Sequence, residues 1–149
     1  MGSRLGDAVT RTVAAIAAIP ASDTLGVGVL ARVVDDPVLD AEKLRDRFTV
    51  QAYRSGEPRR RRGPRAIQHL PEVGLYFAGA VTGRLSHDAH HEIVEAILDR
   101  LELGPLDKRS PRLTWAETEV ETVRDPEAAA AGVFLASYRV RYAAPLVTR

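Results

Sequence analysis

Residues 73–81 read Val-Gly-Leu-Tyr-Phe-Ala-Gly-Ala-Val, and this stretch decides the fold. Its odd-numbered positions are nearly all apolar and its even-numbered positions carry no charge, as in a strand covered on both faces. A helix is predicted soon afterwards, because Ser86 is a favoured N-cap and Asp88 places a carboxylate at the positive helix end. Its apolar face comprises Ile93, Val94, Ile97, Leu98 and Leu101, while His90, Glu92, Glu95 and Asp99 lie mostly away from it. The stretch therefore predicts a buried strand followed by an amphipathic helix over residues 86–101.

The chain before this stretch predicts one helix and two strands. An apolar stripe of Leu5, Val9, Val13 and Ile16 indicates a helix over residues 4–19, which Pro20 ends. Residues 25–34 form a branched, apolar run that reads as a strand closed by the turn Asp35-Asp36-Pro37. Residues 48–53 alternate apolar with polar side chains, which indicates a half-buried strand.

The chain after the central helix predicts a β-hairpin made of residues 113–121 and 133–142. On the second strand Phe134, Ala136, Tyr138, Val140 and Tyr142 share the core face, and Arg139 and Arg141 share the other. Glu117, Glu119 and Glu121 likewise share one face of the first strand. A connecting loop centred near Ala128 places Glu117 opposite Arg139 and Trp115 opposite Arg141. Opposite charges paired in this way contribute about 0.2–1 kcal/mol each, so we expect a charged solvent face.

Composition is that of an ordinary globular protein and excludes several functions. The chain has 149 residues, 45% of them hydrophobic and 28% charged, which suits a single α+β domain over residues 1–149. The net charge of +1 gives no global attraction to nucleic acid or to anionic membranes. The absence of cysteine excludes disulfides, thiolate catalysis and cysteine-bound zinc.

The N-terminal apolar run at residues 13–19 predicts a folded helix rather than a targeting signal. Asp7, Thr10 and Thr12 interrupt the apolar stretch that a secretory signal needs. The run is also much shorter than the roughly 20 residues that span a bilayer. We therefore expect no membrane partner.

Residues 54–71, between two predicted strands, form a long arginine-rich segment with no periodicity, which predicts a loop. Six arginines lie within it, against the single acid Glu57: Arg54, Arg59, Arg60, Arg61, Arg62 and Arg65. Three interpretations remain open: contact with DNA phosphates, docking on an acidic protein, or a solvated loop. The run contains no aromatic residue, so a base-stacking platform is not supported.

Two groups of side chains resemble sites of chemistry but favour a simpler interpretation. His87, His91 and Glu95 recur at four-residue steps, a spacing that can hold a metal, yet the second histidine of His-Glu-x-x-His is missing. We therefore interpret them as an exposed polar helix face and expect no metal and no cofactor. The three glutamates of the hairpin are spaced as an exposed stripe rather than as a catalytic pair in a pocket. The sequence holds no Gly-x-Ser-x-Gly and no Gly-Lys-Ser/Thr motif, and we expect no enzymatic activity.

The order of these elements resembles the tail terminator, or tail completion, proteins of long-tailed phages and gene transfer agents. The resemblance rests on the opening helix over residues 5–19, on residues 73–81 running into the helix over 86–101, and on residues 133–142 after an Asp-Pro-containing loop. It covers nearly the whole chain as a pattern, without a signature motif. It implies a small mixed, mostly antiparallel sheet packed against an N-terminal helix and a central helix. The loop over residues 54–71 is longer and more basic than the family implies.

The resemblance also implies a function without catalytic residues. Such proteins form a ring, usually of six copies, that caps the tail tube and offers a surface to the head–tail connector. The implied partners are further copies of the chain, the tail tube protein, the connector or stopper protein, and transiently the DNA that passes through the ring. The implied location is the tail or neck of a virion or phage-like particle made in the bacterial host cytoplasm. The alternatives are another completion protein of the neck, a nucleic-acid-binding module that uses Arg54–Arg65, and a small metal-dependent enzyme.

On this interpretation the interface combines the arginine segment with the charged hairpin face. The expected residues are Arg54, Arg59, Arg60, Arg61, Arg62, Arg65, Glu117, Glu119, Glu121, Arg139 and Arg141. Two unlike patches of opposite charge suit the head-to-tail contacts of a ring.

Overall fold

The computed structural model describes residues 3–39, 44, 47–123 and 125–148, and the fold within them is a mixed sheet with helices. The elements are α1 (Arg4–Ala17), a short 3-10 helix η1 (Ala21–Asp23), β1 (Val29–Val33), β2 (Phe48–Gly56), β3 (Arg59–Arg61), β4 (Ala66–His69), β5 (Glu72–Ala80), α2 (His87–Glu102), β6 (Thr114–Thr122), α3 (Pro126–Ala130), β7 (Val133–Ala143) and β8 (Val147–Thr148). No helix in these ranges has the length and apolar character needed to cross a lipid bilayer.

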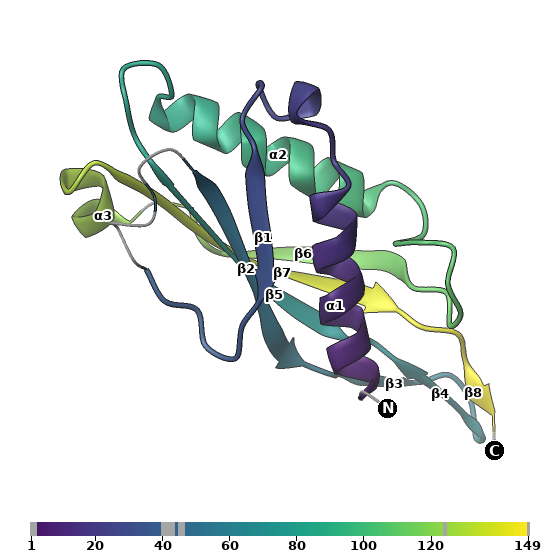
Figure 1. Ribbon diagram of the computed structural model, residues 1–149. Coiled ribbons are helices and arrows are strands. Elements are labelled where there is room, and N and C mark those ends of the chain that lie inside the picture. The colour runs from purple at the N-terminus through teal and green to yellow at the C-terminus, as the bar shows by residue number, and fades with distance from the viewer. Residues whose placement is uncertain (1–2, 40–43, 45–46, 124, 149) are drawn as a thin grey trace.

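Five strands form the main sheet in the order β1-β2-β5-β7-β6 (Figure 1). β1 pairs with β2 in parallel, and the other three pairs are antiparallel. β5 lies at the centre, and most of its residues are buried, as the sequence of residues 73–81 predicts. The predicted class, α+β with a small mixed and mostly antiparallel sheet, is confirmed.

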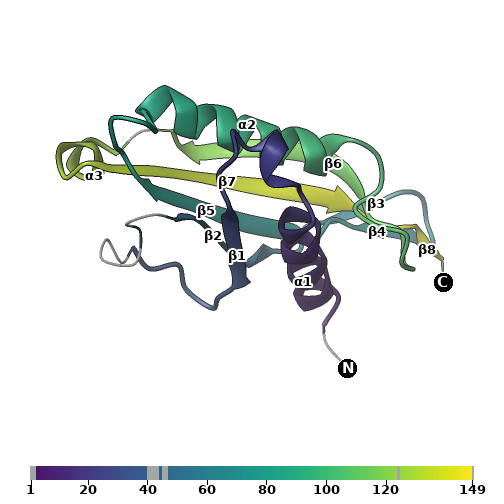
Figure 2. The ribbon, with the colours of Figure 1, turned by 45° about the horizontal axis from the view of Figure 1, so that its top comes forward.

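One face of the main sheet carries both long helices. Serine side chains cap the two helices, with Ser3 Oγ accepting from Gly6 N–H and Ser86 Oγ accepting from Ala89 N–H. The apolar stripe of α1 and the apolar face of α2 pack with the inward residues of β2, β5 and β7 into one continuous core. Figure 2 shows α2 lying along β6 and β7. The N-terminal helix and the central amphipathic helix are therefore confirmed in the places that their periodicity predicts.

The other face of the sheet is divided into an apolar half and a charged half. Near α3, Ala128 packs with Leu44, Ala78, Val133 and Leu135 in a second small cluster. Asp125 caps α3 by accepting from the N–H groups of Glu127 and Ala128, and Pro126 occupies the first turn. The sequence predicts a loop here, because a helix of five residues is too short to show a helical period. The half of this face farther from α3 stays polar.

The predicted hairpin of β6 and β7 is present, but its register differs from the prediction. Glu117 lies opposite Arg141, Glu119 opposite Arg139, and Trp115 opposite Tyr142. Register shifts on either side of the central segment, between Trp115 and Glu117 and between Val120 and Thr122, change the partners. Glu117 is predicted opposite Arg139 and lies opposite Arg141, two residues further along β7. Because side chains alternate with a period of two, a shift of two residues leaves each charged side chain on its predicted face.

The predicted loop over residues 54–71 is instead largely strand. β2 continues to Gly56, and β3 and β4 form a hairpin that β8 extends to three strands. We call residues 57–70 the arginine arm. Figures 1 and 2 show it at the end of the main sheet opposite α3. The prediction was wrong because β3 is exposed and β4 is mostly half-buried, so the hairpin has no apolar alternation in its sequence.

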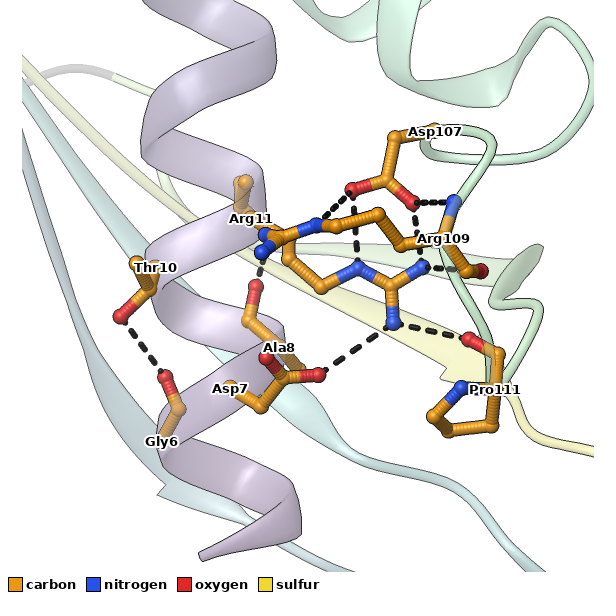
Figure 3. A network of polar contacts seen from close by, with 9 residues as sticks. Gly6, Asp7, Ala8, Thr10, Arg11, Asp107, Arg109 and Pro111 are labelled. Carbon is orange, nitrogen blue, oxygen red and sulfur yellow. Dashed lines mark hydrogen bonds and ion pairs between the residues drawn. The ribbon is translucent and has the colours of Figure 1, made fainter. Parts of the chain in front are cut away.

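A buried arginine ties α1 to the segment between α2 and β6 (Figure 3). The Arg11 side chain is 1% exposed and pairs with both oxygens of Asp107 and, at 3.3 Å, with Asp7. It also donates to the carbonyl oxygens of Arg109 and Pro111. The hydrogen bonds from Arg11 lower the pKa of Asp107 to about 2. This cluster fixes α1 against the rest of the chain.

Candidate interaction surfaces

The charged half of the sheet is organised around Glu72, at the start of β5. Its carboxylate accepts from Arg141 Nη2 at 2.6 Å and from Ser55 Oγ at 2.8 Å, and Arg139 Nη1 lies 3.7 Å away. Burial alone raises the pKa of Glu72, but the hydrogen bonds from Arg141 and Ser55 more than offset it, and the pKa lies below its ordinary value. Glu72 therefore stays charged and gives no proton near neutral pH. Glu72 was not predicted as a site residue, because its only signal in the sequence is one acid before an apolar strand.

The glutamates of β6 complete this charged face. Glu117 Oε2 pairs with Arg141 Nη1 at 3.0 Å, and Glu121 Oε1 with Arg139 Nε at 2.5 Å. Glu119 is exposed and has no ion pair within the described residues. The structure thus brings together five of the predicted interface residues and joins four of them in internal pairs. A partner molecule finds only a small excess of negative charge on this face.

The arginine arm concentrates five exposed arginines within a few residues of one another. Arg59, Arg60, Arg61, Arg62 and Arg65 are all exposed, and none forms an ion pair with a described carboxylate. The arm has one acid, Glu57, so its charge is +4; the whole chain carries +1, and the remainder therefore carries −3. The molecule is consequently polarised, with a basic arm on an acidic body.

The base of the arm is held by several contacts. Glu57 Oε1 lies 3.1 Å from Arg4 Nη1 of α1 and 3.2 Å from His69 Nδ1 of β4. Gln68 Nε2 donates to the carbonyl of Ala144, just before β8. Burial and then the charge of Arg4 lower the pKa of His69. These contacts join the base of the arm to α1 and to the segment before β8.

Arg54 does not belong to the arm, although the sequence analysis groups it with the other arginines. It lies on β2, and its guanidinium rests against Gly6 at the start of α1. A Cβ atom at Gly6 would lie 2.7 Å from Arg54 Nη2, so glycine makes room for this contact. Arg54 therefore contacts the body of the protein.

The outer face of α2 carries a row of acidic residues. Asp88, Glu92, Glu95 and Asp99 are exposed, and none forms an ion pair within the described part of the chain. Their spacing of three and four residues places them along one side of the helix. They place four negative charges on one side of the body.

The histidines of α2 surround an aromatic ring. His87 and His91 meet Phe134 edge-on, with ring centroids 5.6 and 4.9 Å away, and His90 stacks on it at 5.0 Å. Within the described residues no three histidine or acidic side chains converge on a point that suits a metal ion. The ring contacts therefore give these histidines a packing role.

His90 is fully buried, and the prediction that it points away from the apolar face was wrong. Its Nδ1 lies 2.7 Å from the carbonyl oxygen of Ser86, while its Nε2 has no hydrogen-bond partner among the described residues. A Cβ atom at Gly79 would lie 2.6 Å from this nitrogen, so glycine on β5 makes the space for the ring. Burial lowers the pKa of His90, and its neighbours His87 and His91 add to the effect.

We expect the burial of His90 to make the protein less stable in mild acid. The pKa of the folded state lies below the ordinary 6.5, so the unfolded chain binds the proton first. The contribution of His90 to the free energy of unfolding has its full value above pH 6.5. It falls by about 1.4 kcal/mol per pH unit as the pH drops toward the pKa of the folded state. Urea unfolding at several pH values measures this slope.

The His90→Gln variant provides the matched comparison. Below pH 6.5 its free energy of unfolding should depend on pH less steeply, by the amount that one bound proton contributes. His69→Gln should remove the contribution of His69, whose pKa is also lowered in the folded protein. An unchanged slope in His90→Gln would show that the ring takes up its proton in the folded state.

The sequence matches no protein-family model and no curated protein at a significant level. The resemblance to tail terminators therefore stays a prediction.

Proposed function

We propose that the protein is a non-enzymatic structural subunit of a phage tail or phage-like particle. In this proposal it acts as a tail terminator: several copies form a ring that caps the tail tube and joins it to the head–tail connector. The order of elements supports the proposal, since an opening helix, a central strand, an amphipathic helix and a closing hairpin follow one another as in that family. Its partners are further copies of itself, the tail tube protein and the connector.

The observation that carries the proposal is the polarised charge of the subunit. The arginine arm carries +4 at one end of the sheet, and the body carries −3. A ring is built from heterologous contacts, in which one patch meets a different patch on the next copy. A basic arm that meets an acidic body provides two such unlike patches.

The receiving patch differs from the one that the sequence suggests. Glu117 and Glu121 already form ion pairs with Arg141 and Arg139 of the same chain. Binding to an arginine of a neighbouring copy would require these ion pairs to break. The row of acids along α2 is exposed and has no ion pair among the described residues, and it lies on the opposite side of the sheet from the paired glutamates of β6. We therefore propose that the arm of one copy approaches these acids on the next.

Native mass spectrometry of the wild-type protein tests the proposal. We expect a single dominant assembly, with six copies of the 16.2 kDa chain as the expected number, that dissociates as salt is raised because the contacts are between charges. Binding of that assembly to purified tail tubes separates a tail terminator from another neck protein. A monomer at every protein concentration at low salt would refute the ring.

A further inference from the structure

We propose that one face of the arginine arm is a binding site for the phosphates of a nucleic-acid backbone. The site lies on the hairpin of β3 and β4 and does not depend on ring formation. It assigns a ligand to the arm rather than a neighbour in an assembly.

The two faces of the hairpin differ. Arg59 and Arg61 alternate with Arg60 along β3, so they lie on one face, together with Ile67 opposite Arg61. Arg60 lies on the other face opposite Gln68. The five arginines are thus divided between two surfaces, and a hollow lies on the surface of Arg59 and Arg61.

The hollow has a volume of about 380 Å³ and is lined by three arginines. Arg59, Arg61 and Arg65 contribute the charge, and Pro64 and Ile67 contribute apolar surface. No carboxylate lines the hollow, so nothing in its wall neutralises the three guanidinium groups. A group with several anionic oxygens fits this set, because guanidinium forks bind phosphate through paired hydrogen bonds.

Arg61 is held in place before any ligand arrives. Its Nε donates to the carbonyl oxygen of Gly63 at 3.2 Å, and Nη2 lies 3.5 Å from the carbonyl oxygen of Pro64. On the other face, Arg62 Nε donates to Gln68 Oε1 at 3.3 Å. Less side-chain freedom is lost on binding when a guanidinium is already positioned.

The charge distribution favours nucleic acid over an acidic protein for this face. The hollow presents charge of one sign only, as phosphate-binding surfaces do. The arm projects from the end of the sheet opposite α3, so its tip is the place where a long polyanion avoids the acidic body (Figure 1). The arm holds no aromatic residue, so contact is with the backbone and independent of sequence.

Fluorescence anisotropy with a short labelled DNA duplex tests the site. For three phosphate contacts, the logarithm of the binding constant should fall with the logarithm of salt concentration with a slope of about −2.7. Arg59→Gln with Arg61→Gln should weaken binding by about tenfold at low salt and reduce the slope by about two. Arg65→Gln alone should reduce the magnitude of this salt slope by about one.

The matched control is Arg60→Gln with Arg62→Gln, which removes the same charge from the other face of the same hairpin. It should keep most of the affinity, and equal thermal midpoints of all variants establish that each is folded. The site is overturned if both double variants weaken binding equally, if the wild-type protein leaves the duplex free at low salt, or if a labelled polyglutamate peptide binds as tightly as DNA. A monomer that binds DNA through Arg59 and Arg61 would support this site and refute the ring.

Discussion

Replacing Arg11 with alanine should lower the free energy of unfolding by about 3 kcal/mol. Arg11 is 1% exposed, and its loss removes two hydrogen bonds from Asp107 and the Arg11 donors of two backbone carbonyl groups. We place the value at the lower end of the range for broken buried pairs because the Asp107 side chain remains 27% exposed. Urea unfolding at neutral pH measures the change.

Arg109→Ala is the matched control. Arg109 Nε also lies 3.3 Å from Asp107, but its side chain is 60% exposed, so its loss should cost less than about 1 kcal/mol. Equal costs for the two arginines would contradict the role given to Arg11.

The acid dependence of stability gives a second readout of the same pair. Asp107 has a folded pKa of about 2, below the usual 3.8, so its stabilising contribution is complete above about pH 4 and is lost as the pH falls through 2. Arg11→Ala should remove this part of the acid dependence, because the hydrogen bonds from Arg11 are its main cause.

Elements with a clear period could be predicted from the sequence. β5 and α2 bury the residues that their patterns assign to the core, except that His90 is also buried. The faces of β7 were predictable for the same reason, because alternation depends only on the strand itself. The register of the β6–β7 hairpin was not predictable, since the shifts in β6 follow from pairing with β7 rather than from a local signal.

The arginine arm escaped prediction because its structure depends on distant parts of the chain. Ile67 of β4 pairs with Val147 of β8, and Glu57 pairs with Arg4 of α1. Neither contact has a signature in the local sequence, and the run of arginines there resembles a solvated loop.

Two polar residues of the core region, Glu72 and His90, were missed for a related reason. Glu72 is stabilised by Arg141 across the sheet, and His90 fits because Gly79 lies on a neighbouring strand. Each residue is a single position whose surroundings come from other elements, so periodicity cannot identify it.

Reversing the charge of the arm should abolish assembly. In the variant with Arg59, Arg60, Arg61 and Arg62 all replaced by glutamate, the arm is acidic and is repelled by the acidic body of the next copy. The four side chains are exposed and lack ion pairs among the described residues, so the fold should persist. An unchanged thermal midpoint establishes this.

A second quadruple variant controls for the change in net charge. It replaces four exposed arginines of the body by glutamate: Arg32, Arg84, Arg100 and Arg112. Its net charge changes by the same amount, while the arm is left intact. Loss of assembly in both variants would assign the effect to net charge rather than to the arm.

The mass of the arm-reversed protein in native mass spectrometry tests the central claim most directly. We predict a single chain of 16.2 kDa for this variant, at concentrations where the wild-type protein and the body-reversed control keep the mass of a closed assembly. An arm-reversed variant that retains the mass of the wild-type assembly would contradict the claim that the arginine arm joins neighbouring copies.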